Sequence, residues 1–390
     1  MKKYSRLEKR RQSVERANKR WKADLSWVRF YIMAYFVVLF LCGCGKEETD
    51  PGYDMGGEDM VFAGQLGIGW NLGNSLESVC KDGRYTGNAV ELYWQNPATT
   101  KAMIDEVRRA GFTLLRLPVT WEGHMDGQGN IDEEWLGRVK EVVDYGMENG
   151  MYVILNAHHD TWFEPVPENE ENAVRKMADV WRQVGEYFAE YDNHLLFEGM
   201  NEPRWIGSAE EWTGGSAGTA AIVNRLNQVF VDTVRGQGGN NGGRYLLVAT
   251  YGNSVEESAL DAFVMPEGEH LIVTVHAYLP YGFAMDAQGT GTWGKEGAAE
   301  LDAVMERLGQ RFVANGIPVL IGEFGAIDKG NTGERLKWLE DYKDAAKRHG
   351  IGLVWWDEGG RPGETYGRFR IFDRERMEWL FPEIRDALVE

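Results

Sequence analysis

The chain of 390 residues carries 61 Asp and Glu against 42 Lys and Arg, a formal charge of −19. A negative field of this size repels phosphate backbones and argues against nucleic acid as a partner, whereas a neutral polymer is indifferent to it. Of the three cysteines, only Cys80 would remain as a thiol once a leader ending at residue 43 is removed and Cys44 is acylated, so no disulfide framework is expected. Because 43% of the residues are hydrophobic, the chain can instead bury one large core.

The N-terminal stretch is basic and then apolar. Residues 1–29 hold eleven Lys and Arg against three acids, and 30–41 form an apolar block that runs into LCGC at 41–44. This pattern is typical of a signal peptide, here residues 1–43, with the following cysteine in a bacterial lipobox. We expect Cys44 to become the acylated first residue of the mature protein. A transmembrane anchor is the weaker alternative, because the block is too short to span a bilayer, and ordinary secretion is another.

A polar, acidic and glycine-rich segment follows at 44–60, and we interpret it as a flexible tether. Its first residues resemble the export tag that sends lipoproteins to the cell surface in Bacteroidetes-type bacteria. The sequence therefore predicts a secreted lipoprotein that Cys44 holds at the outer membrane. The folded domain is expected at 61–390.

Short apolar runs alternate with longer amphipathic stretches through this domain. The runs predict eight strands, at 66–72, 113–119, 152–158, 194–200, 245–251, 271–278, 319–325 and 351–356. The amphipathic stretches predict helices at 99–110, 134–149, 173–191, 220–235, 299–315 and 335–349, and the connection between 251 and 271 lacks a clear long helix. Continuously apolar strands separated by helices indicate a parallel (β/α)8 TIM barrel, with a doubly wound sheet as the alternative.

Polar side chains stand at the ends of most of these runs. In a (β/α)8 barrel the active site lies at the C-terminal ends of the strands, so one rim would gather these residues. Each residue alone has an ordinary structural explanation, but several unrelated ionisable groups buried at one rim would be costly. The candidates are Asn71, Arg116, His158, Asn201, Glu202, His276, Tyr278, Glu323 and Trp356.

Two of these candidates are carboxylates. Glu202 follows the fourth run, and Glu323 interrupts the seventh. Two carboxylates that face each other raise one another's proton affinity, so that one remains protonated while the other is ionised. Retaining glycosidases need this division between an acid and a nucleophile. We expect a raised pKa for Glu202 and an ionised Glu323.

The chain also resembles glycoside hydrolase family 5, and most of all its subfamily 4. The resemblance covers residues 62–388 and is carried by GWNLGNS (69–75), RLPVTW (116–121), LNAHHD (155–160), FEGMNEPR (197–204), VHAYLPYGF (275–283), IGEFGA (321–326) and VWWDEG (354–359). It implies that Glu202 is the general acid/base and Glu323 the nucleophile. The family's supporting residues fall on Arg116, His158, Asn201, His276, Tyr278 and Trp356.

Several supporting roles also follow from the chemistry of the side chains. Asn201 can hydrogen-bond the sugar 2-hydroxyl, a contact that strengthens in the transition state. Arg116 and Tyr278 can keep Glu323 ionised, and His276 can tune Glu202. Trp356 offers a flat face to a pyranose ring.

The remaining candidates lie on the first and third strands. Asn71 would line the glycone side. His158 and His159 point to opposite faces if the strand continues, which makes a chelating pair improbable, and His159 can contact substrate or cap the strand. Two positions depart from the family pattern, since Glu77 stands where relatives usually carry Asp, and Glu358 where they usually carry an amide.

These features predict an endo-acting retaining β-1,4-glucanase, monomeric and without a cofactor or metal. Xyloglucan, mixed-linkage β-glucan and amorphous cellulose are candidate substrates, and mannan is the alternative. A non-catalytic glycan-binding barrel and a metal-dependent barrel enzyme are the other classes considered. Candidate walls of the substrate cleft are Tyr93, Trp94, Trp162, Phe163, Trp205, Trp212 and Trp293.

Overall fold

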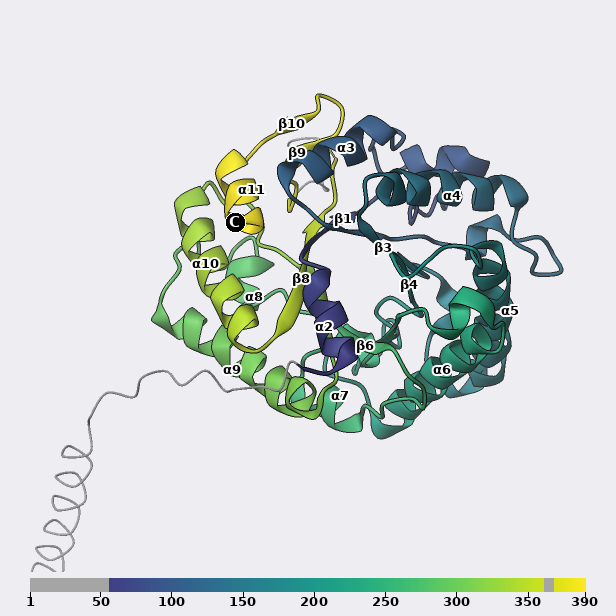
Figure 1. Cartoon of the computed structure of the whole chain (residues 1–390). Coiled ribbons are helices and arrows are strands. Elements are labelled where there is room, and N and C mark those ends of the chain that lie inside the picture. The colour runs from purple at the N-terminus through teal and green to yellow at the C-terminus, as the bar shows by residue number, and fades with distance from the viewer. Residues whose placement is uncertain (1–55, 361–367) are drawn as a thin grey trace, which may run out of the picture. The chain divides into compact units, whose positions relative to one another are not determined.

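The computed structural model describes residues 56–360 and 368–390, in which eight parallel strands close into a barrel in chain order (Figure 1). The strands are β1 (Ile68–Leu72), β2 (Leu114–Leu117), β3 (Tyr152–Asn156), β4 (Leu195–Glu198), β5 (Leu246–Ala249), β6 (Leu271–His276), β7 (Val319–Phe324) and β8 (Ile351–Asp357). Each strand overlaps the apolar run that predicted it. The (β/α)8 barrel is therefore confirmed, and the doubly wound sheet is wrong.

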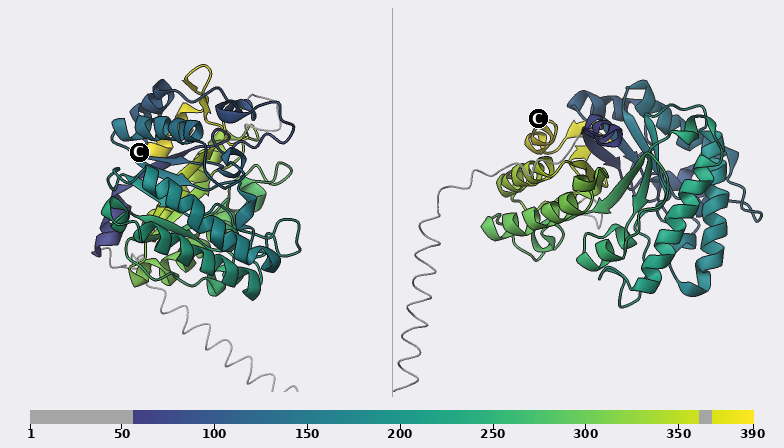
Figure 2. Two further views of the ribbon diagram at one scale, coloured as in Figure 1. Left: turned by 90° about the vertical axis from the view of Figure 1, so that its right-hand side faces the viewer. Right: turned by 60° about the horizontal axis from the view of Figure 1, so that its bottom comes forward.

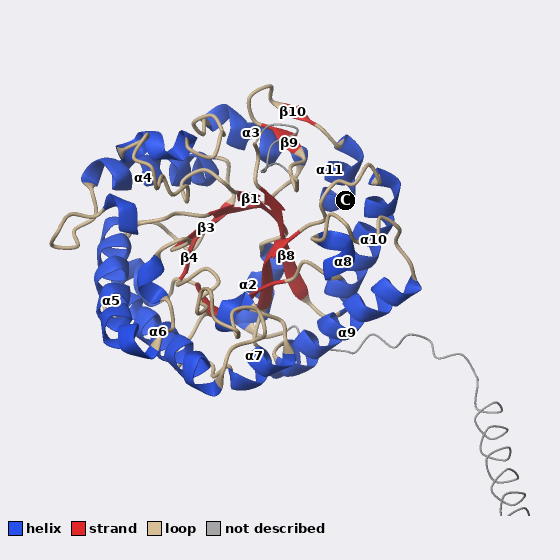
Figure 3. Cartoon of the chain, turned by 180° about the vertical axis from the view of Figure 1, so that it is seen from behind, coloured by secondary structure: helices blue, strands red, loops and turns tan. Residues whose placement is uncertain are grey.

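Helices surround the strands, as the side views and the view from behind show (Figures 2 and 3). The long ones match the predicted stretches and are α3 (Lys101–Ala110), α4 (Glu133–Glu148), α5 (Glu170–Tyr187), α6 (Ala217–Arg235), α9 (Lys295–Arg311) and α10 (Thr332–Arg348). The connection without a predicted long helix contains the short α7 (Glu257–Ala262). Other elements are α8 (Tyr281–Ala284), the hairpin of β9 (Phe372–Asp373) and β10 (Glu378–Trp379), and α11 (Pro382–Val389), together with α2 (Glu58–Gln65) and several short 3-10 helices in the loops.

Helix α3 illustrates how the sequence produces these elements. Met103, Ile104 and Val107 recur at helical spacing and are buried against the barrel. The helix ends at Gly111, whose φ of 117° lies in the left-handed region that a side chain would strain. A Cβ at this glycine would also lie 2.9 Å from Val389, so the same residue allows α11 to pack close by.

The first described helix, α2 (Glu58–Gln65), begins inside the segment 44–60 that we interpreted as a tether. Its Phe62 stacks on Tyr245 with ring centroids 3.5 Å apart, and α2 lies across one opening of the barrel (Figure 1). The predicted signal peptide and Cys44 lie outside the described residues. Among residues 56–360 and 368–390, no helix combines the length and apolar character needed to cross a membrane.

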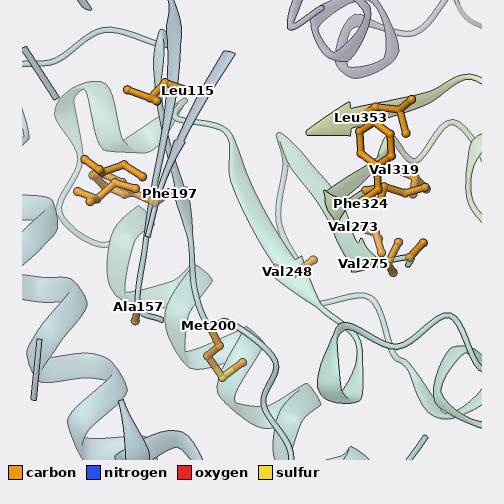
Figure 4. Packing of buried hydrophobic residues seen from close by; sticks show 14 of the residues in the cluster. Leu115, Ala157, Phe197, Met200, Val248, Val273, Val275, Val319, Phe324 and Leu353 are labelled. Atoms are coloured by element: carbon orange, nitrogen blue, oxygen red, sulfur yellow. The ribbon is translucent and has the colours of Figure 1, made fainter. Parts of the chain in front are cut away.

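The barrel interior is layered because side chains alternate along each strand. The lower layer, at the end of the barrel that α2 covers, is apolar and packs against Phe62. It consists of Leu66, Leu114, Ile154, Leu196, Tyr245, Leu247, Ile272, Leu320 and Val354. The alternate side chains, among them Leu115, Phe197, Val273 and Phe324, belong to the main core with the helices (Figure 4). Inward-facing positions two residues beyond the lower layer are mostly polar. They form the floor of the open end of the barrel.

Candidate active site

Arg116 on β2 is the centre of the polar layer. Its side chain has no exposed surface, and its guanidinium donates to Glu198 (2.7 Å), Glu323 (2.8 Å), Asn201 (2.8 Å) and Asn71 (3.0 Å). Burial disfavours its charge, but the two carboxylates together raise the pKa of Arg116 above its ordinary value. This permanent cation therefore ties residues from β1, β2, β4 and β7 into one buried network.

Glu198 is a part of this network that the sequence motifs did not single out. It is fully buried and accepts hydrogen bonds from Asn156 Nδ2 (3.1 Å) and Thr274 Oγ1 (3.0 Å) as well as from Arg116. The signal was present in the register, because Glu198 lies two residues after inward-facing Leu196 on a four-residue strand. A carboxylate at that position has to point into the barrel and needs a buried cation.

Glu323 reaches the site because β7 is irregular. The register with β8 shifts between Ile321 and Phe324, and such irregularities re-aim side chains. A Cβ at Gly322 would lie 2.9 Å from Thr274 Oγ1, so glycine there leaves room for the strand's course. Glu323 then accepts from Arg116 at Oε1 and from the Tyr278 hydroxyl at Oε2, the latter at 2.9 Å.

Glu202 lies in the loop after β4, with a left-handed φ of 46° that is uncommon for a residue other than glycine. Its backbone N–H donates to Asn253 Oδ1 at 2.6 Å, which supports this conformation. Its carboxylate has two basic neighbours, His276 Nδ1 at 3.0 Å from Oε1 and Arg204 at 3.0 Å from Oε2. The acid is thus held by the loop backbone and by its side-chain contacts.

The structure brings the two predicted catalytic carboxylates together. One oxygen of Glu202, one oxygen of Glu323 and a nitrogen of His276 lie within 4.8 Å of one another. This spacing is close to the separation of about 5–5.5 Å found in retaining enzymes and shorter than the roughly 6.5–9.5 Å of inverting enzymes. The same three residues are close enough to hold a cation, but Arg116 and Arg204 already supply positive charge to the two carboxylates.

The pKa shifts of the free site run opposite to the sequence-based expectation. Burial works against the charged form of Glu202, but the hydrogen bond and charge of His276, with Arg204, lower its pKa to about 2. Burial raises the pKa of Glu323, and the charge of Glu202 adds to this rise. Among the causes that lower the pKa of Glu202, the contact with His276 is the largest, so this order depends on the position of the imidazole.

The other predicted residues lie around this pair. His158 contacts Asn156 through Nδ1 at 2.9 Å, and burial lowers its pKa well below the ordinary value. Its ring is nearly parallel to that of Trp356, with centroids 5.9 Å apart. His159 is exposed and forms a T-shaped contact with Trp94, with ring centroids 5.4 Å apart. These residues extend the site from the carboxylates toward β3 and β8.

Two of the predicted cleft walls are wrong. Trp162 and Phe163 are both only 4% exposed and belong to the main core. Trp205 and Trp212 are exposed and remain candidates. Trp293 packs on Phe283 in the loop after β6.

Comparison with known proteins identifies the family. The model of the family described as cellulase (glycosyl hydrolase family 5) matches residues 77–361. The chain belongs to glycoside hydrolase family 5. This hydrolase is 41% identical over 334 residues to Endoglucanase A of Clostridium longisporum, a match that covers 83% of the chain and 64% of the relative. It thus spans slightly less than two thirds of that relative's length.

Solved structures of other family 5 hydrolases are similar over most of the chain. A GH5-4 broad specificity endoglucanase from Ruminococcus champanellensis with bound cellotriose has a TM-score of 0.82 at 37% identity, covering 85% of this chain and 98% of that one. XEG5A, a xyloglucan-specific endo-β-1,4-glucanase from a metagenomic library, has a TM-score of 0.81 at 36% identity, covering 84% and 97%. The similarity to a GH5-4 enzyme agrees with the resemblance to subfamily 4.

The buried pair of Arg116 and Glu198 leads to a prediction about stability. Replacing Glu198 by Gln removes one of two counter-charges of a fully buried guanidinium, and breaking such a pair costs about 3–5 kcal/mol. The midpoint of unfolding by guanidinium chloride should therefore be clearly lower for Glu198→Gln than for the wild type. Glu170→Gln, which breaks a partly exposed pair with Arg225, is the control and should change stability by less than about 1 kcal/mol. Equal midpoints for the two variants would contradict the prediction.

Two further buried carboxyls lead to a prediction about pH. Glu77 accepts backbone hydrogen bonds from Asn74 and Ser75, and Asp160 accepts them from Trp121 and Glu122. Burial is the main cause that raises the pKa of each to about 7. Glu77 departs from the family pattern, and its buried carboxyl stabilises the loop by hydrogen bonds to the backbone.

A carboxyl with a raised pKa binds its proton more tightly in the folded chain than in the unfolded one. Its contribution to stability is complete below the unfolded pKa of about 4 and is lost as the pH rises through about 7. The loss amounts to roughly 3–4 kcal/mol for each group. The free energy of unfolding of Glu77→Gln/Asp160→Asn should consequently fall less between pH 5 and pH 8 than that of the wild type. Parallel pH curves for the two proteins would contradict the assignment.

Proposed function

We propose that this family 5 hydrolase cleaves β-1,4-glucan chains internally by double displacement with retention of configuration. The observation that carries the proposal is the Glu202–Glu323 pair at the C-terminal mouth of the barrel, with oxygens within 4.8 Å. Glu323 attacks the anomeric carbon while Glu202 gives its proton to the glycosidic oxygen. Glu202 then removes a proton from water, which attacks the same carbon and releases Glu323.

The neighbours of the two carboxylates supply charge and orientation. Arg116 and Tyr278 donate to separate oxygens of Glu323 and hold it in one position for attack. Asn201, fixed by Arg116, is available for the sugar 2-hydroxyl. The hydrogen bonds of Arg116 and Tyr278 to Glu323, and of Arg116 to Asn201, are formed before substrate arrives. The site can therefore stabilise the transition state without reorganising.

His276 lies beside both carboxylates of the pair. Its Nδ1 lies 3.0 Å from Glu202 and 3.6 Å from Glu323. Burial raises the pKa of Glu323, so the carboxylate pair holds a proton before substrate arrives. In the substrate complex this proton lies on Glu202, which leaves Glu323 ionised for attack.

Similar proteins support the substrate class. The Ruminococcus champanellensis endoglucanase has broad specificity and binds cellotriose, and XEG5A is xyloglucan-specific. We propose xyloglucan, mixed-linkage β-glucan and amorphous cellulose as substrates. NMR of the first product from barley β-glucan tests the proposal, with a β-configured reducing end expected and turnover unchanged by chelator. An α-configured product would refute retention, and no turnover of any glucan would refute the function.

We further propose that the enzyme is an exported lipoprotein, acylated at Cys44 and displayed at the outer membrane. Support comes from the basic and apolar pattern before this cysteine and the acidic segment after it. A polysaccharide too large for a porin has to be cut outside the cell, and several acyl chains suffice for stable anchoring. Protease shaving of intact cells should remove the wild type, and Cys44→Ser should no longer fractionate with membranes. A membrane-bound Cys44→Ser would disprove anchoring through this residue.

A further inference from the structure

Arg204 lies between the general acid and an exposed loop. Its guanidinium donates to Glu202 Oε2 and to the Glu202 carbonyl oxygen, both at 3.0 Å, and on its other side to Glu211 Oε1 at 3.3 Å. About a fifth of each of these side chains is exposed. The guanidinium thus joins two carboxylates at the edge of the site, one of which is the acid.

An indole covers this guanidinium. The guanidinium carbon of Arg204 lies 4.2 Å from the ring centroid of Trp212, within the range of a cation–π contact. Trp212 is nevertheless 60% exposed, so much of its surface remains open to solvent. Arg204 therefore lies between a large exposed aromatic ring and the carboxyl that protonates the leaving group.

The loop that presents these side chains is fixed at several points. Gly207 N–H donates to Glu211 Oε2 at 2.8 Å, and Trp205 N–H donates to the Tyr251 hydroxyl at 3.0 Å. Gly252 N–H donates to the Pro203 carbonyl oxygen at 2.8 Å. The position of Arg204 is consequently set by the fold of the loop as well as by its own ion pairs.

The titratable and charged groups that face Glu202 come from several segments. His276 lies on β6 and Tyr278 follows it, Glu323 lies on β7, His159 lies in the loop after β3, and Arg204 lies in the loop of Glu202 itself. His276 also contacts Glu323, whereas Arg204 forms its ion pairs with Glu202 and Glu211. Arg204 is therefore the cation whose removal perturbs the acid while leaving the supports of the nucleophile in place.

We propose that Arg204 is a positioning residue for Glu202 and couples this acid to a binding site for the leaving-group sugar on Trp212. The inference rests on the proposed function, in which Glu202 protonates the glycosidic oxygen, so that the departing sugar lies on the side of Glu202. A pyranose ring presents axial C–H groups that pack against an aromatic face. Sugar on Trp212 restrains the indole that covers Arg204, and Arg204 holds the acid oriented toward the bond to be cut.

Arg204→Gln tests the positioning role with two substrates. Removing a cation beside the carboxylate pair should move both limbs of the pH profile of kcat/KM to higher pH, by roughly one unit. kcat/KM on barley β-glucan should fall about tenfold or more, because proton donation is impaired. The leaving group of a dinitrophenyl cellobioside needs no proton, so kcat/KM for this substrate, which reports only the first step, should fall less than about threefold. Its turnover also reports a folded enzyme.

Two control variants sharpen this test. Arg204→Lys keeps the charge and should restore the pH limbs without fully restoring turnover, since one ammonium cannot contact both carboxylates in the same geometry. Arg225→Gln removes a cation from a surface pair and should leave both profiles unchanged. If Arg204→Gln keeps the wild-type pH limbs, or if both substrates fall equally, the positioning role is wrong.

Trp212→Ala tests the sugar site. The KM for β-glucan should rise several-fold, while the aryl cellobioside, whose leaving group is no sugar, should keep its kinetic constants. Val264→Ala, at another exposed apolar residue, should change neither substrate. An unchanged KM for β-glucan in Trp212→Ala would overturn the sugar site. A wild type inactive on both substrates would remove the proposed function itself, a result distinct from the selective failures above.

Discussion

Glu323→Ala should lose on the order of 10⁴-fold or more in turnover of β-glucan, because no other side chain contacts the anomeric carbon as a nucleophile in the proposed mechanism. The fold should persist, since Arg116 retains Glu198 as a buried counter-charge. Azide can enter the space left by the carboxylate and attack an activated substrate from the same face. The product should be an α-glycosyl azide, detected by NMR.

The control for this loss is Glu340→Ala, which removes an exposed acid from helix α10 and should retain wild-type turnover. The configuration of the azide product makes the test decisive. A β-glycosyl azide from Glu323→Ala would assign Glu323 to the acid/base role and reverse the proposed mechanism.

Glu202→Gln should lose about 10²–10⁴-fold on β-glucan, the range expected for removal of a general acid. With a dinitrophenyl cellobioside the first step needs no acid, but the second still needs a base to activate water. The variant should therefore release a burst of dinitrophenol and accumulate the covalent glycosyl-enzyme, visible by mass spectrometry. Azide should relieve the block and give a β-glycosyl azide.

The pH dependence gives an independent reading of the same residue. In the wild type the profile of kcat/KM should be bell-shaped, and its basic limb reports the last proton of the Glu202–Glu323 pair. Glu202→Gln has no such proton, so the basic limb should disappear from its residual activity on β-glucan. Turnover of ordinary polysaccharide within tenfold of the wild type would show that Glu202 is not the acid.

The sequence predicted the barrel and most of the site because both follow from short-range rules. Apolar runs and amphipathic stretches specify strands and helices, and the geometry of a parallel barrel places the polar ends of strands at one rim. Arg116 and His276 lie at this rim on their strands for this reason. Glu323 reaches it through the register shift of β7, and Asn201 reaches it from the loop after β4.

The residues that were missed depend on register or on loop geometry. Glu198 was readable from its place two residues after Leu196, but Arg204 and Asn253 reach Glu202 through backbone turns that no periodicity specifies. The pKa of Glu202 lies below that of Glu323 because His276 and Arg204 are within hydrogen-bond distance of Glu202. Such distances follow from packing, so a sequence pattern could only predict that the two carboxylates would differ.

The nucleophile lies inside the barrel and the acid lies on a connecting loop, and this separation affects how such enzymes can diversify. Glu323 is bound to a guanidinium inside a closed ring of strands, where a substitution removes one of the two counter-charges of Arg116 and lowers stability. Glu202, Arg204 and Trp212 lie on a connecting loop, where insertions and replacements are tolerated far better. Substitutions in this loop can therefore change the leaving-group side of the site at a small cost in stability, whereas a substitution beside the nucleophile changes folding stability as well as catalysis.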